Sequence, residues 1–206
     1  MKEFIVVDFN GALLSPRPFN ETHKAWFQTM SVLLNDPSIN NHAGKENYFE
    51  KVDEVMTLYL GNVNSETKTK FARQLFSMTL IAEIKKEDLS QEFVEYLQGL
   101  KEKYKIALVT SAPSTSVEPI LNKLGISDLF DVIIKSEENK RPKKQELIKE
   151  FIKKHKTPLF YVGFGDKDLE FCKDLNIKTV SVNWFTESKN KGDFNVNEVS
   201  ELKNIL

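Results

Sequence analysis

The sequence FIVVDFNGALL, residues 4–14, joins a short run of large apolar residues to an aspartate, Asp8, and a glycine, Gly11. A β-branched apolar run of this length is typical of a strand buried on both faces of a parallel sheet. Equivalent runs recur downstream, and the predicted strands are 4–8, 106–110, 131–135, 159–163 and 178–182. Helical patterns separate the later runs, at 115–124, 143–154 and 168–175. Strands that alternate with helices predict an α/β fold, a Rossmann-like three-layer parallel sheet whose first strand is central.

The segment between the first two strands has a different pattern. Residues 19–98 contain no convincing strand, and amphipathic helical patterns cover 22–34, 46–60, 66–82 and 89–98. An insertion of about 80 residues is too long for a simple crossover connection. We therefore expect an inserted all-helical cap at 16–88, placed over the carboxyl ends of the strands. The core is then formed by 1–15 and 89–206.

The composition of the chain limits the classes of function. The chain has 206 residues, and 29 basic against 30 acidic residues give a formal net charge of −1. This balance offers no long-range attraction to nucleic acid or to an anionic membrane. The single cysteine, Cys172, excludes an internal disulfide and a cysteine-based zinc cluster. No apolar run approaches the roughly 20 residues that span a bilayer, and we expect a cytoplasmic protein. The sequence carries no signal for an oligomeric state.

The residues that follow the first two predicted strands are candidates for a site, because ligands of open α/β sheets bind outside the carboxyl ends of the strands. Asp8 follows the first strand, and its carboxylate could act as a nucleophile or bind a cation. Capping of the following turn explains Asp8 equally well. Thr110 and Ser111 end the second strand and precede a helix. They could bind an oxyanion there, or they could simply cap the helix.

Charged residues follow the third and fourth predicted strands. The basic turn KRPKK, residues 140–144, could neutralise a phosphate or the Asp8 carboxylate, although most residues of such a turn are solvated. Asp166 and Asp168 come after the fourth strand. They could bind a hard cation such as Mg²⁺, or complement the dipole of the helix that they begin.

Four of these stretches, taken together and in order, resemble the motifs of the haloacid dehalogenase (HAD) superfamily. The sequence FIVVDFNGALL is similar to the first motif, hhhDxDGTL, in which h is an apolar residue. The second motif is similar to ALVTS, residues 107–111, and LFDVIIKSE, from residue 129, is similar to the stretch before the family's lysine. The fourth motif, hVGDxxxDhxxAxxAGI, is similar to YVGFGDKDLEFCKDLNI, residues 161–177. The resemblance implies a HAD-like core whose insertion is a C1-type helical cap.

The resemblance also implies roles for individual residues. Asp8 would attack a phosphate group and carry an aspartyl-phosphate, and Thr110 would bind that phosphate. Asn10 stands where the family has its general acid and base, and an amide cannot transfer protons. The substrate would also contact the N–H group of Ser111, together with Gly11.

The position of the family's lysine is ambiguous. That lysine usually precedes a proline, and here the residue before Pro142 is Arg141. Lys140 or Lys143 could take its place. We favour Lys140 as the catalytic residue, with Lys143 as a contact to the substrate.

Mg²⁺ is the cofactor that the resemblance implies, with Asp8, the backbone carbonyl of Asn10, Asp168 and Asp166 as its ligands. Phe164 stands where the fourth motif has its first metal-binding aspartate. The resemblance predicts a Mg-dependent phosphatase that acts on a small phosphorylated metabolite. The departures at Asn10, Arg141 and Phe164 leave a second hypothesis open, that of a weakened or inactive homologue that binds a ligand or a protein partner.

Overall fold

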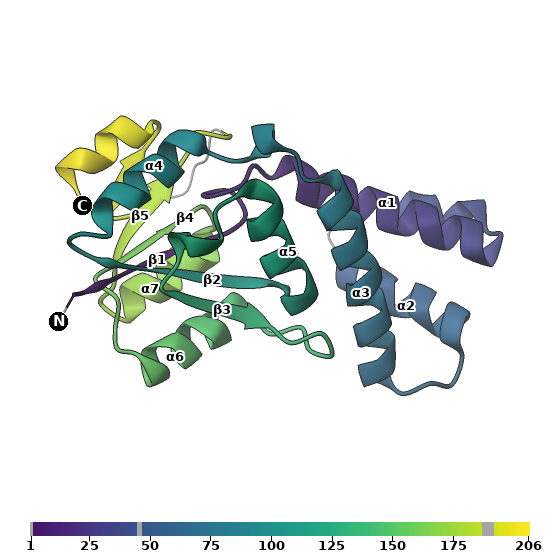
Figure 1. The fold of residues 1–206 in the computed structure, drawn as a ribbon. Helices are drawn as coiled ribbons and strands as arrows, with labels where there is room; N and C mark the ends of the chain where they lie inside the picture. Colours follow the sequence, from purple (N-terminus) through teal and green to yellow (C-terminus); the bar gives the residue numbers. More distant parts are fainter. Residues whose placement is uncertain (1, 45–46, 187–191) are drawn as a thin grey trace.

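The computed structural model describes residues 2–44, 47–186 and 192–206, which form one six-stranded sheet between two layers of helices (Figure 1). The strands are Phe4–Val7 (β1), Lys105–Pro113 (β2), Val132–Ser136 (β3), Phe160–Gly163 (β4), Lys178–Val182 (β5) and Phe194–Val196 (β6). Their order is β3-β2-β1-β4-β5-β6, and each neighbouring pair is parallel. The prediction of a Rossmann-like parallel sheet with its first strand at the centre is confirmed.

Strand β6 has no counterpart among the predicted strands. Only Val196 of its three residues is buried, so the strand lacks the apolar run that reveals the other five. It pairs with β5 in parallel and extends the sheet at one edge. A 3-10 helix, Val199–Asn204, follows it.

The two faces of β1 show why the sheet is covered on both sides. Side chains alternate between the faces of a strand, and all four residues of β1 are buried. Ile5 and Val7 belong to a hydrophobic cluster that includes side chains of α4 (Gln91–Leu100) and α5 (Ser114–Leu124). Phe4 and Val6 belong to a second cluster, which includes side chains of α6 (Lys144–Lys154) and α7 (Asp166–Asp174). Burial on both faces anchors the strand that leads to Asp8.

The described residues of 16–88 form helices joined by short connections, with no strand among them. The helices are α1 (Arg17–Leu34), α2 (Tyr48–Leu60) and α3 (Ser65–Glu83), together with the 3-10 helices Pro37–His42 and Lys86–Asp88. They surround a hydrophobic cluster of their own, which includes Trp26, Phe27 and Met56. Figure 1 shows α1, α2 and α3 grouped together to one side of the sheet. This arrangement supports the division into a core, 1–15 and 89–206, and a cap, 16–88, which we keep as a proposal.

The first cap helix starts earlier than expected, and the expected start of the second lies outside the described residues. Helix α1 begins at Arg17 rather than at 22, because a proline follows at the next position, and the fixed φ of proline suits the first turn of a helix. The expected start of the second cap helix, at 46, lies outside the described residues.

In the described part of the chain, no helix is both long enough and apolar enough to cross a membrane.

Asp88 holds together the two chain segments that connect the core with the cap. Leu14 and Leu89 form an antiparallel bridge, and the N–H group of Ser15 donates to the carbonyl of Asp88 (2.8 Å). The buried carboxylate of Asp88 accepts hydrogen bonds from the Ser15 hydroxyl (2.8 Å), the Arg17 Nε (2.8 Å) and the Lys85 N–H group (2.9 Å). One side chain therefore fixes where the cap leaves the core and where it returns.

We predict that Asp88→Asn lowers the free energy of unfolding by about 2 kcal/mol, because an amide keeps the shape of the side chain but loses its charge-assisted hydrogen bonds. Chemical denaturation at neutral pH measures this change. Glu87→Gln is the matched control, because Glu87 is an exposed neighbour, and it should change the free energy of unfolding by less than about 0.5 kcal/mol.

The effect of Asp88→Asn should also depend on pH. Burial raises the pKa of Asp88, but the hydrogen bonds from Arg17, Lys85 and Ser15 outweigh it and hold the pKa below its usual 3.8. A carboxylate with a lowered pKa stabilises the folded state above its unfolded pKa and loses that contribution as the pH falls through its folded pKa. The stability difference between parent and variant should therefore narrow as the pH drops from about 4. A difference that stays constant down to about pH 2 contradicts this assignment.

Candidate active site

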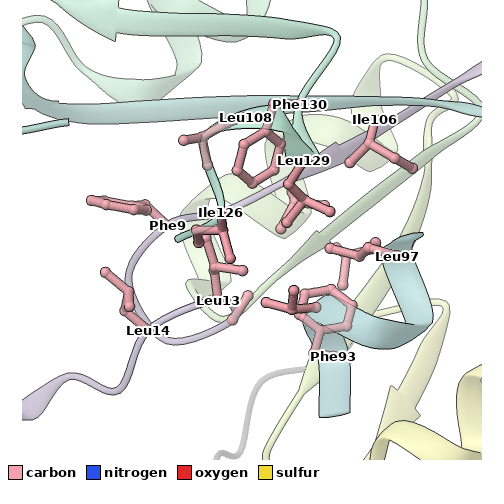
Figure 2. Packing of buried hydrophobic residues seen from close by; sticks show 14 of the residues in the cluster. Phe9, Leu13, Leu14, Phe93, Leu97, Ile106, Leu108, Ile126, Leu129 and Phe130 are labelled. Carbon is pink, nitrogen blue, oxygen red and sulfur yellow. The ribbon is translucent and has the colours of Figure 1, made fainter. Parts of the chain in front are cut away.

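Asp8 lies directly after β1, at the carboxyl end of the central strand. Its N–H group donates to the carbonyl of Val162 in β4 (2.9 Å), and its side chain is only 4% exposed. The loop that follows is anchored by Phe9, Leu13 and Leu14, which are fully buried. Figure 2 shows these three side chains in the same hydrophobic cluster as Phe93 of α4. The buried apolar side chains of the loop thus fix the main chain next to the Asp8 carboxylate.

Gly11 serves the backbone of this loop. Its φ is +86°, a left-handed conformation that favours glycine, and its N–H group donates to the carbonyl of Leu14 (2.7 Å). A Cβ atom at Gly11 would lie 2.6 Å from the Cβ of Phe164, so a side chain cannot be accommodated there. Gly11 is not among the residues that line the cavity described below. The structure therefore explains the glycine by the conformation of the loop, and it does not place Gly11 where a contact to a substrate was expected.

Lys144 is the lysine that the structure places beside Asp8. Its Nζ lies 2.5 Å from Oδ2 of Asp8 and 3.4 Å from Oδ2 of Asp168, and its side chain is only 14% exposed. Burial alone lowers the pKa of Lys144, but the negative charges of Asp8 and Asp168 outweigh it and raise the pKa above its usual 10.5. The ammonium group therefore stays protonated and offsets the buried carboxylates.

This position corrects the expectation that Lys140 or Lys143 lies beside Asp8. The Nζ of Lys140 pairs with Glu137 (2.8 Å), and the Lys140 side chain is 62% exposed. Lys143 is exposed and precedes α6 in an extended conformation. Lys144 is the first residue of that helix, so the point at which α6 begins decides which lysine of the basic turn faces Asp8.

Asp168 joins the site through Lys144, whereas Asp166 does not. Oδ1 of Asp168 accepts a hydrogen bond from the Gln145 amide (2.6 Å), and Oδ2 faces Lys144. Burial raises the pKa of Asp168 above its ordinary value, although Lys144 opposes the shift. Asp166 is the first residue of α7 and is exposed. The structure thus keeps one of the two acids that were expected to bind a metal ion.

A cavity of about 250 Å³ lies between the strand ends and the cap. Its core side is lined by Asp8, Asn10, Thr110, Ser111 and Lys144. Thr110 is buried, whereas Asn10 and Ser111 are exposed. Four of the residues expected at the site therefore meet in one place, together with a lysine that the sequence did not single out.

The cap side of the cavity is dominated by rings. These belong to Phe19, His23, Trp26, Tyr48, Phe49 and Phe76. The imidazole of His23 lies 4.2 Å from the ring of Tyr48 between centroids, and burial lowers the pKa of His23 to about 4, so the ring is neutral at neutral pH. The sequence does not reveal these rings, because aromatic residues at helical spacing are also the ordinary core of a helical subdomain.

Two arginines complete the lining. The Nη2 of Arg73, in α3, donates to the carbonyl of Ser111 (3.2 Å), and the Nη1 of Arg141 donates to Asp53 in α2 (2.8 Å). Burial lowers the pKa of Arg73 to about 10, with Glu138 raising it and Arg141 lowering it further, so the guanidinium remains charged at neutral pH. The cavity therefore receives positive charge from both the cap and the core.

The side chains present do not fit the expected magnesium ion. Among the described residues, no three histidine, cysteine, aspartate or glutamate side chains are grouped so that they could hold a metal ion. Both oxygens of Asp168 face other side chains, and Phe164 is a hydrocarbon at the family's metal-binding position. Oδ1 of Asp8 is buried without a hydrogen-bond partner in the described structure, but it is a single oxygen, and Mg²⁺ requires several oxygen ligands in octahedral geometry.

The motifs and the fold agree with the comparisons to known proteins. The family model for haloacid dehalogenase-like hydrolases matches residues 5–182, which run from the second residue of β1 to the end of β5. The chain belongs to this family of hydrolases. No curated protein has a significant match to the sequence.

Solved structures with the same fold include proteins that are described as phosphatases or hydrolases. The HAD phosphatase from Thermococcus onnurineus is 17% identical, with a TM-score of 0.65 over 100% of this chain and 97% of that chain. The HAD-hydrolase YfnB from Bacillus subtilis, bound to magnesium, is 13% identical, with a TM-score of 0.66 over 100% and 99%. A mutant of CbbY from Rhodobacter sphaeroides, in complex with xylulose-(1,5)bisphosphate, is 14% identical, with a TM-score of 0.65 over 98% and 96%. At these identities the likeness shows the fold alone.

We predict that Lys144→Met lowers the free energy of unfolding by about 3–5 kcal/mol, because it leaves the carboxylates of Asp8 and Asp168 buried without a cation. Urea denaturation at neutral pH measures the loss. Lys143→Met is the matched control, because it makes the same change at the adjacent, exposed position, and it should have an effect of less than about 0.5 kcal/mol.

A double variant separates loss of the ion pair from loss of packing. Asp8→Asn removes the charge that Lys144 offsets, so Asp8→Asn in the Lys144→Met background should recover part of the stability. Equal losses for Lys144→Met and Lys143→Met, or no recovery in the double variant, would show that this ion pair does not hold the site together.

Proposed function

We propose that this protein is a phosphohydrolase that acts on a small phosphorylated molecule through an aspartyl-phosphate on Asp8. The state of the Asp8 carboxylate carries the proposal. Lys144 holds Oδ2, while Oδ1 is buried and has no hydrogen-bond partner among the described residues. A carboxylate oxygen in this state, in the lining of a cavity, is available as a nucleophile.

The proposed reaction has two steps. Oδ1 of Asp8 attacks the phosphorus atom, and the bond between phosphorus and the ester oxygen breaks, with its electron pair leaving on that oxygen. Water then attacks the aspartyl-phosphate, which releases inorganic phosphate and restores the carboxylate. Thr110 and the N–H group of Ser111 would bind the phosphate oxygens, and Lys144 would offset negative charge throughout.

Asn10 limits the first step. The leaving oxygen must gain a proton, and an amide cannot supply one, so water has to do so. Esters whose leaving group is stable without immediate protonation, such as aryl phosphates, should therefore react fastest.

Magnesium is the cofactor that family membership implies, and the related YfnB structure contains it. The side chains around Asp8 do not fit the ion, for the reasons given above. We therefore propose that Mg²⁺ binds weakly to this chain and that neither step requires it.

The nature of the ligand is supported by one structural relative. CbbY is described in complex with a phosphorylated sugar. The cavity of this chain lies at the same carboxyl edge of a parallel sheet at which ligands of such folds bind. A small phosphorylated molecule is thus the class of ligand that we assign to it.

The packing of Phe164 favours a second candidate function. Phe164 lies so close to Gly11 that it occupies the space beside the first motif, and Asn10 removes the proton-transfer group. A protein with both changes could bind a phosphorylated ligand or a protein partner without turning a substrate over.

Incubation with acetyl phosphate separates the two functions. We expect intact-mass spectrometry to show a phosphoryl adduct that peptide mapping locates at Asp8, because acetyl phosphate has a reactive leaving group that needs no general acid. Asp8→Asn is the control and should form no adduct. If inorganic phosphate binds but the parent never forms the adduct, the binding function replaces the hydrolase.

We predict that turnover is limited by two lost carboxylates and can be partly restored. Asn10→Asp should raise the steady-state rate on 4-nitrophenyl phosphate, and general acid catalysis is worth about 10²–10⁴ in rate. The gain should be larger in a Phe164→Asp background, because the acid helps little until a cation neutralises the phosphate. A Mg²⁺ titration of the parent, both single variants and the double variant measures these effects.

Two controls define the outcome of the restoration. Phe164→Asn opens the same space without adding a charge and should restore less than Phe164→Asp. Asp8→Asn should remove all turnover. If the parent is already fast and Asn10→Asp slows it, the assignment of Asn10 as a lost acid is wrong. If no variant exceeds Asp8→Asn, the chain has no latent phosphatase activity.

A further inference from the structure

The cavity contains more positive charge than a phosphate site at Asp8 explains. Arg73 and Arg141 each donate one hydrogen bond, to the Ser111 carbonyl and to Asp53 respectively. The Nε of Arg73 and the Nη2 of Arg141 are buried and have no hydrogen-bond partner in the described part of the chain. Both side chains line the cavity. A buried donor atom without an acceptor is costly unless a ligand supplies one.

Arg141 is held against the cap. Its Nη1 pairs with Asp53 in α2, and its guanidinium lies over the ring of Phe49, 5.4 Å from the centroid. The charge of Lys144, by contrast, is already offset by Asp8 and Asp168. The unused positive charge of the cavity therefore lies at Arg73 and Arg141 rather than at Lys144.

The cap side of the cavity is aromatic and offers few neutral polar groups. Of the described residues that line the cap side, His23 and Tyr48 are the only ones that are polar and uncharged. A polyhydroxylated ligand would leave most of its hydroxyl groups without partners in this space. A flat apolar body would instead stack on rings such as Phe49 and Phe76, which are not fully buried.

We propose that the ligand of this cavity is a phosphorylated molecule with a flat, apolar body and a second anionic group, a carboxylate. The guanidinium groups of Arg73 and Arg141 receive the carboxylate, the rings of the cap hold the body, and the phosphate lies at Asp8. This assignment rests on the proposed phosphate site at Asp8, and it excludes sugar phosphates as the preferred ligands.

Hydrolysis-resistant phosphonates test the assignment without turnover. Isothermal titration calorimetry on the unaltered protein should give 4-(phosphonomethyl)benzoate at least about a 10-fold lower Kd than benzylphosphonate, the same molecule without its carboxylate. Benzylphosphonate should in turn bind more tightly than the phosphonate analogue of glucose 6-phosphate. Equal affinities for the two benzyl compounds, or tighter binding of the sugar analogue, overturn the proposal.

Two substitutions locate the carboxylate. Arg141→Gln and Arg73→Gln should each reduce the advantage of 4-(phosphonomethyl)benzoate over benzylphosphonate to less than about 3-fold, since each removes a charged donor. Lys140→Gln is the control, because Lys140 is exposed and does not line the cavity, and it should leave the advantage unchanged. If either arginine variant weakens both compounds equally, that arginine holds the phosphate and the proposal is overturned.

The phosphonate binding measurements and the acetyl phosphate experiment can give independent outcomes. A carboxylate preference without an acetyl phosphate adduct supports the ligand class and refutes the enzyme. An adduct on Asp8 without a carboxylate preference supports the enzyme and refutes the ligand class. If neither the phosphonates nor inorganic phosphate bind, the phosphate site itself is wrong and the ligand class falls with it. For each arginine variant, the quantity compared is the ratio of the Kd values of the two benzyl compounds. The phosphonate measurements on the unaltered protein test the proposal even if a variant fails to fold.

Discussion

The ion pair between Lys144 and Asp8 is the interaction on which the site depends. A carboxylate at the end of a strand that is buried on both faces needs a cation, because burial of an unpaired charge is prohibitive. Lys144 provides it from the start of α6 and also faces Asp168 at the start of α7. The carboxyl ends of β1 and β4 are thereby joined to the helices on one face of the sheet. One lysine between two carboxylates leaves an excess of negative charge, which the arginines of the cavity oppose.

The fold could be predicted because burial on two faces leaves an unambiguous pattern. Each of the five predicted strands contains apolar residues that are buried in the structure, and parallel topology then brings Asp8 after β1, Thr110 in β2 and Asp168 after β4 to one edge. Strand β6 escapes this reasoning because it is short and has a single buried side chain. The start of α1 is also missed, since Pro16 and Pro18 flank its first residue, Arg17, although the fixed φ of Pro18 suits the first turn of a helix.

The site was less predictable, and the reason is geometric. A strand end fixes the position of its following residue, but the basic turn before α6 contains three lysines within five residues, 140–144. Which of them faces Asp8 depends on the first residue of the helix, and a shift of one residue turns a side chain by about 100°. The arginines and rings of the cavity come from the cap, and only the packing of the cap on the core brings Arg73 to Ser111. Such contacts between distant segments leave no local pattern.

The loss of the metal-binding position and the arginines of the cavity belong to one electrostatic problem. A phosphate that approaches a carboxylate must have its charge offset, and a bound metal ion would do this from the core alone. Here Phe164 fills the metal-binding position, and a large part of the remaining positive charge depends on the cap, through Arg73 in α3 and through Asp53, which holds Arg141. Charge that is carried by the cap acts at Asp8 only when the cap is in place. The hydrogen bonds of Asp88 fix both connections between the core and the cap. They thus affect the chemistry of the Asp8 carboxylate, although Asp88 does not contact it.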